Sequence, residues 1–134
     1  MKILHFLKSK EKIRFVSENK FIENRKKLVL ISIEKLVYLR DFNIEEEDKL
    51  KIEFNFYTNT LKKSEEFAKQ IQKLNYTVQN QVSLNNKGLF VINGLTTEMK
   101  MMYEVLREWN VEMCDLGYKF DCNFDSWEII FDSK

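Results

Sequence analysis

Strict alternation of apolar and polar residues predicts a β-strand over residues 49–57. Successive side chains of a strand point to opposite faces of its sheet, so this period gives one buried and one exposed face. The buried face would carry Leu50, Ile52, Phe54 and Phe56. The exposed face would carry Lys51, Glu53, Asn55 and Tyr57.

Before this strand, apolar residues recur near helical spacing over residues 20–40 and predict one long helix. These residues are Phe21, Ile22, Val29, Ile33, Leu36 and Val37. The run 28–33 is also compatible with a strand. Four acids at 45–48 would form a solvated connection and a hinge to the rest of the chain.

After the strand, a second helix is predicted to run to about residue 74. Thr60 or Ser64 would cap it, and Glu65 and Glu66 would lie in its first turn, where they favour the helix dipole. Its apolar stripe would consist of Phe67, Ala68, Ile71 and Leu74.

The next segment reads as a hairpin. Tyr76, Val78 and Val82 predict its first strand, residues 85–88 its turn, and residues 89–92 its second strand. The pair Asn93-Gly94 would end that second strand.

A third helix would follow, capped by Thr96 or Thr97 with Glu98 in its first turn, and Gly117 would end it. Its buried face would carry Met102, Val105, Leu106, Trp109, Met113 and Leu116. Residues 119–131 would supply one or two further strands.

From residue 49 the predicted order is therefore βαββαβ, which is the ferredoxin-like order. It implies an α+β fold with an antiparallel sheet, both later helices on one face, and the helix at 20–40 as an addition. At 134 residues the chain fits one domain, which we place at 20–134, with a basic N-terminal arm at 1–19.

Charge supports that division of the chain. Residues 1–40 carry eleven basic and four acidic side chains, whereas residues 41–134 carry eleven basic and seventeen acidic ones. No apolar run approaches the roughly 20 residues of a membrane span, which favours a cytoplasmic protein without a membrane partner. Cys114 and Cys122 have no metal-binding spacing and are expected to be reduced thiols.

The residues give little support to catalysis. His5 is the one histidine, and the three glycines are isolated, so neither a nucleophile with a base nor a phosphate loop is indicated. Asp121 and Asp125 lie four apart among aromatic residues, but acids of an edge strand explain them better than a general acid pair. We therefore predict a protein that is not an enzyme and has no metal or cofactor.

Nucleic acid is an unfavoured direct ligand. The strand at 89–92 lacks the basic and aromatic signature of an RNA-recognition motif, and a net negative body repels phosphate. Only the basic arm and the start of the first helix suit RNA, through Lys8, Lys10, Lys12, Arg14, Arg25, Lys26 and Lys27.

Four stretches resemble a known family. They are Asn-Arg-Lys-Lys-Leu at 24–28 ahead of Leu-Lys-Ile-Glu-Phe, the run Glu-Glu-Phe-Ala-Lys-Gln-Ile-Gln-Lys-Leu-Asn-Tyr-Thr-Val at 65–78, the long helix with Met113, and Phe-Asp-Ser-Trp at 124–127. Over about residues 20–134 the chain resembles the regulator of ribonuclease E activity B (RraB), a bacterial protein inhibitor of that nuclease. Ser126 and Asn75 replace glycines of the family, and this chain is less acidic.

The resemblance implies a ferredoxin-like fold and a protein that binds ribonuclease E or another nuclease through an acidic surface. On this basis the expected partner-binding residues are Glu112, Asp115, Asp121, Glu128 and Asp132. The expected structural motif consists of Tyr76, Phe124, Asp125 and Trp127. Trp127 would pin the last strand in the core, and Asp125 would brace the turn before it.

Two alternatives stay open. An immunity or antitoxin protein that neutralises a toxin would suit the same acidic domain, and a small RNA-binding module would use the basic arm. The partner, the binding surface and the oligomeric state do not follow from the sequence.

Overall fold

The computed structural model describes residues 14–82 and 87–131. Its elements in chain order are α2 (Glu18–Arg40), β1 (Lys49–Thr58), α3 (Leu61–Gln72), β2 (Thr77–Val82), β3 (Phe90–Leu95), β4 (Met99–Lys100), α4 (Tyr103–Lys119) and β5 (Asn123–Ile130). This order confirms the α+β prediction of an N-terminal helix followed by βαββαβ. The two-residue strand β4 was not predicted.

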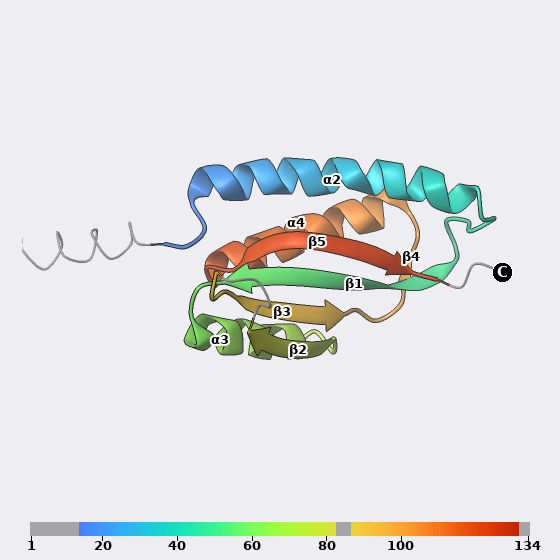
Figure 1. Cartoon of the computed structure of the whole chain (residues 1–134). Helices are drawn as coiled ribbons and strands as arrows, with labels where there is room; N and C mark the ends of the chain where they lie inside the picture. The colour runs from blue at the N-terminus through green and yellow to red at the C-terminus, as the bar shows by residue number, and fades with distance from the viewer. Residues whose placement is uncertain (1–13, 83–86, 132–134) are drawn as a thin grey trace, which may run out of the picture.

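The sheet is antiparallel and is built around β1. Strand β1 pairs with β3 on one side and with β5 on the other, and β2 pairs with the outer edge of β3. Strand β4 pairs only with the first two residues of β1. Figure 1 shows α2 running alongside α4, and α3 lying at the opposite end of the sheet beside β2.

One face of the sheet carries the core. Ile52, Phe54 and Phe56 of β1 are fully buried, as the alternating pattern predicts. Phe56 stacks on Phe124 of β5 with ring centroids 4.4 Å apart, and Phe67 of α3 lies 4.5 Å from the Phe56 ring. Burial of each of these aromatic side chains contributes about 1.5–3 kcal/mol to stability.

Helix α2 confirms the predicted helix over 20–40 and excludes the strand alternative for 28–33. Ser17 caps it by accepting a hydrogen bond from the Lys20 amide. Its core-facing residues are Leu28, Ser32, Leu36 and Leu39. Ile33 and Val37, which the periodicity also placed in the apolar stripe, are instead exposed to solvent.

Helix α3 begins at Leu61, capped by the Thr60 hydroxyl, which accepts from the Lys63 amide. The alternative cap Ser64 is therefore wrong, and Glu65 and Glu66 lie beyond the first turn. Leu74 is 44% exposed because the helix ends before it. Asn75 then takes a positive φ of 66°, a conformation that Asn tolerates.

Strand β3 does not stop at Asn93-Gly94 but continues to Leu95. The predicted break is wrong because Gly94 serves packing: a Cβ there would lie 2.2 Å from the Phe54 ring. The Asn93 amide donates to the Asn55 side chain across the sheet at 3.0 Å. Of the predicted turn before β3, residues 83–86 lie outside the described residues, and Gly88 has a φ of +67°.

Neither Thr96 nor Thr97 caps α4, which begins at Tyr103 after Met102 and without a side-chain cap. Glu98 is therefore not in its first turn. The Thr96 hydroxyl is used elsewhere, since it accepts from the Ile52 amide at 2.9 Å and donates to the Thr97 carbonyl at 2.8 Å. These bonds hold the chain against β1 where β3 ends.

The end of α4 also differs from the prediction. Gly117 lies inside the helix, where a Cβ would come within 2.5 Å of the Phe56 ring. The positive φ after the helix belongs to Asp121, at 59°. The Cys122 amide reaches back to the Gly117 carbonyl at 2.8 Å and closes the helix end.

Candidate functional site

The closing region, residues 121–127, packs its aromatic side chains into the core. Phe124 is 4% exposed and Trp127 is 2% exposed. The Trp127 ring contacts Trp109 of α4 edge-on, with centroids 5.6 Å apart, and the Lys35 ammonium of α2 lies 4.9 Å from the Trp127 ring centroid. Trp127 therefore joins β5 to α2 and α4.

A β-bulge in the closing region determines where Asp125 points. Phe124 pairs with Phe56 and Ser126 with Asn55, so Asp125 is the extra residue of β5. It is exposed, and its carboxylate makes no hydrogen bond or ion pair within the described part of the chain. The predicted brace at Asp125 is therefore not observed. Ser126 takes no positive φ and needs no glycine conformation.

Asp121 supplies the brace instead. Its carboxylate accepts from the amides of Phe15 at 2.9 Å and Val16 at 2.8 Å, and from the Lys63 ammonium at 2.7 Å. The Arg14 guanidinium lies 3.5 Å away. The Asp121 carbonyl accepts from the Thr58 hydroxyl at 2.9 Å. One residue thus joins the start of the described chain, α3, β1 and the end of α4.

These contacts fix the charge of Asp121. Burial alone would raise its pKa, but the hydrogen bonds from Lys63, Val16 and Phe15 outweigh burial and hold the pKa of this carboxyl below its usual value. The side chain is 11% exposed. The oxygens of Asp121 are thus engaged within the fold, and its place in a binding patch stays a prediction.

Residues just before α2 also pack against the fold. Val16 is 3% exposed and belongs to the core, and the Arg14 guanidinium lies over the Tyr118 ring at 4.1 Å. Tyr118 in turn stacks on Phe21 at 4.4 Å. Residues 14–19, which the charge pattern assigned to the arm, are thus part of the folded unit.

The exposed carboxylates of α4 form a single row. Spacings of four, four and three residues place them on one side of the helix, opposite its buried residues. We call this set the acid row: Glu104, Glu108, Glu112 and Asp115. Asp115 pairs with Arg25 of α2 at 3.1 Å, and the other three make no ion pair with any described residue.

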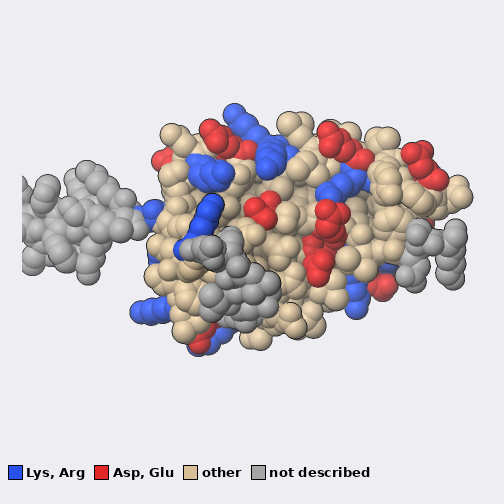
Figure 2. Space-filling view, in the orientation of Figure 1, with Lys and Arg blue, Asp and Glu red and all other residues tan. Residues whose placement is uncertain are grey.

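Glu128 lies on β5, apart from the acid row of α4. It is the cross-strand neighbour of Glu53, and it pairs with Lys35 of α2 at 3.3 Å. The predicted acids Glu112, Asp115 and Glu128 therefore do not form one patch, and Asp132 lies outside the described residues. Figure 2 likewise shows acidic and basic groups interspersed on the face it presents.

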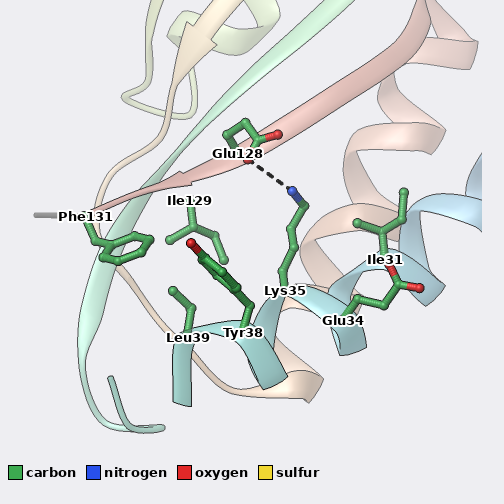
Figure 3. Close-up of a pocket in the computed structure, with 8 residues that line it drawn as sticks. All are labelled: Ile31, Glu34, Lys35, Tyr38, Leu39, Glu128, Ile129 and Phe131. Carbon is green, nitrogen blue, oxygen red and sulfur yellow. Dashed lines mark hydrogen bonds and ion pairs between the residues drawn. The ribbon is translucent and has the colours of Figure 1, made fainter. Parts of the chain in front are cut away.

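A groove of about 360 Å³ separates α2 from the end of β5. Figure 3 shows the Lys35–Glu128 ion pair at one end, and the rings of Tyr38 and Phe131 toward the other. The groove is lined by Ile31, Glu34, Lys35, Tyr38, Leu39, Glu128, Ile129 and Phe131. It offers mainly apolar contact and carries no group of residues arranged for catalysis.

Tyr76 is a packing residue directly before β2. Its ring lies 6.0 Å from the Phe54 ring, and the side chain is half-buried against the core. Burial raises the pKa of its hydroxyl.

The nucleophilic side chains are placed for packing. Cys114 and Cys122 are buried free thiols, and burial raises the pKa of each to about 12, so neither is a thiolate at neutral pH. Within residues 14–82 and 87–131, no three His, Cys, Asp or Glu side chains gather as metal ligands. No helix in those ranges is long and apolar enough to cross a membrane.

Comparison with known families identifies the class of protein. The family model described as regulator of ribonuclease activity B, RraB, matches residues 36–129. That range covers well over half of the chain and includes β1 to β4, all but the last residue of β5, the acid row and the whole closing region. The chain belongs to this family of regulators. No curated protein matches it in sequence.

Sequence reasoning missed two features. The Asp121 brace depends on Arg14 and Lys63, which are distant in sequence, and the available signal was an Asp after a helix end, where a positive φ is tolerated. The second feature is an exposed apolar row on α2, considered below. Its signal was the presence of apolar residues on more than one side of that helix.

Proposed function

We propose that this protein is a non-enzymatic regulator that binds a ribonuclease of the ribonuclease E type through the acid row. The observation that carries the proposal is the position of three exposed carboxylates, Glu104, Glu108 and Glu112, without described cationic partners. Ribonucleases need basic surfaces to bind RNA, and a row of negative charge is complementary to such a surface.

The acid row is also electrostatically unfavourable for the free protein. Like charges four apart on a helix destabilise it by about 0.2–0.5 kcal/mol per pair. Glu104, Glu108 and Glu112 make two such pairs. These three carboxylates lower stability and make no ion pair with a described residue, which fits a role in binding.

The first test is affinity capture from nuclease-treated lysate of the native cell, followed by mass spectrometry. Recovery of a ribonuclease of this type that resists RNA removal supports the proposal. Recovery of one unrelated toxin would assign the protein to the immunity class instead. Capture of proteins only when RNA is intact would point to an RNA-binding module.

The second test compares two charge reversals in binding to the recovered ribonuclease. Glu108→Lys with Glu112→Lys alters the acid row, and Glu65→Lys with Glu66→Lys makes the same change in charge on exposed positions of α3. The first variant should bind about tenfold more weakly, or 1.4 kcal/mol, mainly through slower association, and should inhibit cleavage less.

The α3 variant should bind as the unmodified protein does. Equal losses in both variants would attribute binding to net charge and exclude the acid row as the site. Unchanged binding in the first variant would also exclude it. Glu128, on β5 and apart from the acid row, serves as a further control.

A further inference from the structure

The outer side of α2 carries an exposed apolar row that the proposed function does not use. Leu30 is 63% exposed, Ile33 46% and Val37 62%. Their spacing of three and four residues places them on one side of the helix, away from the buried Leu28 and Leu36. Monomeric proteins commonly expose single apolar residues, whereas a contiguous row marks an interaction site.

This row borders the seam between α2 and α4, which is hollowed in two successive places. The first hollow, of about 570 Å³, is lined by Arg25, Lys26, Val29, Leu30, Arg107 and Val111. The second, of about 220 Å³, is lined by Ile33, Leu36, Val37, Arg40 and Tyr103. Along α2 the seam extends from Lys26 to Arg40, or about 21 Å at 1.5 Å per residue.

The charged residues that line the two hollows are all basic, and Asp115 of the acid row lies beside one of them, Arg25. The two hollows are lined by Arg25, Lys26, Arg40 and Arg107, and by no acidic residue. Arg25 is neutralised by Asp115, but Lys26 and Arg107 make no ion pair with a described residue. Arg40 donates to the carbonyls of Ile44 and Met101, which leave its charge in place. The seam thus combines an apolar floor with a positive rim.

We propose that the α2/α4 seam binds an acidic amphipathic helix of a protein partner. Apolar side chains at i, i+3 or i+4, and i+7 of that helix would contact Leu30, Ile33 and Val37. Its flanking carboxylates would face Lys26 and Arg107. This is the helix-in-groove mode of recognition, and the length of the seam fits about four helical turns.

Charge argues against the occupants that the chain itself could supply. Residues 1–13 carry four lysines and one glutamate, so the positive rim disfavours them. A second copy of the chain could place its acid row or its α2 apolar row in the seam. Its acid row contains no apolar residue, and its α2 apolar row is flanked by the basic residues Lys26 and Arg40. The concave apolar floor favours a protruding helix over a flat bilayer or a nucleic-acid backbone.

The test selects peptides of about 16 residues, the length that spans the seam, from a display library on the full chain. The pool is then depleted on the variant Leu30→Ser with Val37→Ser. Both residues are more than 60% exposed, so this variant should remain folded, which circular dichroism checks. The surviving peptides should be acidic, with apolar residues at helical spacing.

Charge reversal then distinguishes binding of an acidic helix from non-specific hydrophobic binding. The best acidic peptide should bind at least about tenfold more weakly to Leu30→Ser with Val37→Ser. It should also weaken with Lys26→Glu and Arg107→Glu, and a peptide whose Glu residues are replaced by Lys should recover binding to that second variant. Leu61→Ser, at a 53% exposed position of α3, is the matched control and should leave binding unchanged.

Three results would overturn the proposal. The first is a surviving pool that is empty or has no excess of acidic residues. The second is self-association in sedimentation that Leu30→Ser with Val37→Ser abolishes, which would make a second copy the occupant. The third is binding to vesicles containing phosphatidylglycerol that the same variant loses. None of these measurements involves a ribonuclease, so they leave the proposed function unaffected.

Discussion

The closing region and the acid row both carry carboxylates, but Asp121 in the closing region is held by partners within the fold, whereas most of the acid row is not. Asp121 in the closing region accepts three hydrogen bonds within 2.9 Å and lies beside a guanidinium. In the acid row, Glu104, Glu108 and Glu112 have no described cationic partner. The first arrangement lowers the free energy of the fold, whereas the second raises it through like-charge repulsion.

This difference separates structural acids from acids that are available for binding. Asp121 and Asp125 stand four residues apart in one segment, yet the first joins four parts of the chain and the second lies exposed on a bulge. An acidic residue near a family motif is therefore weak evidence for a binding role. Substitutions in the closing region should reduce stability, and substitutions in the acid row should weaken binding without destabilising the fold.

The largest effect is expected for Trp127→Ala. The substitution removes a side chain that is 2% exposed and contacts both Trp109 and Lys35. The loss of buried area and the cavity left behind should lower the free energy of unfolding by about 3–5 kcal/mol. Urea denaturation followed by circular dichroism measures this change.

Trp127→Phe provides the control for that prediction. The buried indole Nε1 of Trp127 has no hydrogen-bond partner among the described residues, so Phe loses packing but no hydrogen bond. Its cost should stay below about 1.5 kcal/mol. A fully stable Trp127→Ala protein would show that the closing region does not anchor β5.

A smaller loss, of about 1–3 kcal/mol, is expected for Asp121→Asn. Asparagine keeps the shape and tolerates the positive φ of 59°, so the substitution tests the charge-assisted bonds from Lys63 and the amides of Phe15 and Val16. Asp125→Asn is the matched control and should change stability by less than about 0.5 kcal/mol. Equal effects in the two variants would contradict the comparison.

The Asp121 contribution should also depend on pH. Because its pKa is lowered by folding, the stabilisation is complete above the unfolded pKa of about 3.9 and is lost as pH falls through the lower folded pKa. The difference in unfolding free energy between the unmodified protein and Asp121→Asn should therefore be constant near neutral pH and shrink below about pH 4. A difference that persists at lower pH would assign the effect to shape and not to charge.

The sequence predicted the elements whose pattern is local. Strand β1 was found because its alternation reflects one buried face, and the βαββαβ order followed from similar patterns. Contacts between distant segments explain the errors. From the sequence, Gly94 was predicted to end a strand, but in the structure it makes room for the Phe54 ring. Thr96 was predicted as a possible helix cap, but its hydroxyl accepts a hydrogen bond from the Ile52 amide.

The candidate surfaces were less predictable for the same reason. Apolar residues occur on two sides of α2, and periodicity cannot say that Leu28 faces the core while Leu30 faces solvent. The partners of Asp121 lie 58 and 107 residues away in the sequence. Of the acid row, Glu112 and Asp115 were predicted from the sequence, but they were grouped with Asp121 and Glu128, which lie outside α4.

The smallest expected effect tests the acid row itself. Glu108 has a like charge four residues away on each side, at Glu104 and Glu112, so Glu108→Gln removes both repulsions. The substitution should raise the free energy of unfolding by about 0.5 kcal/mol, an effect that added salt should reduce because these charges are exposed. Urea denaturation at low and high ionic strength measures both. A loss of stability would mean that Glu108 makes a favourable contact within the chain, and the acid row would then be structural, as Asp121 is.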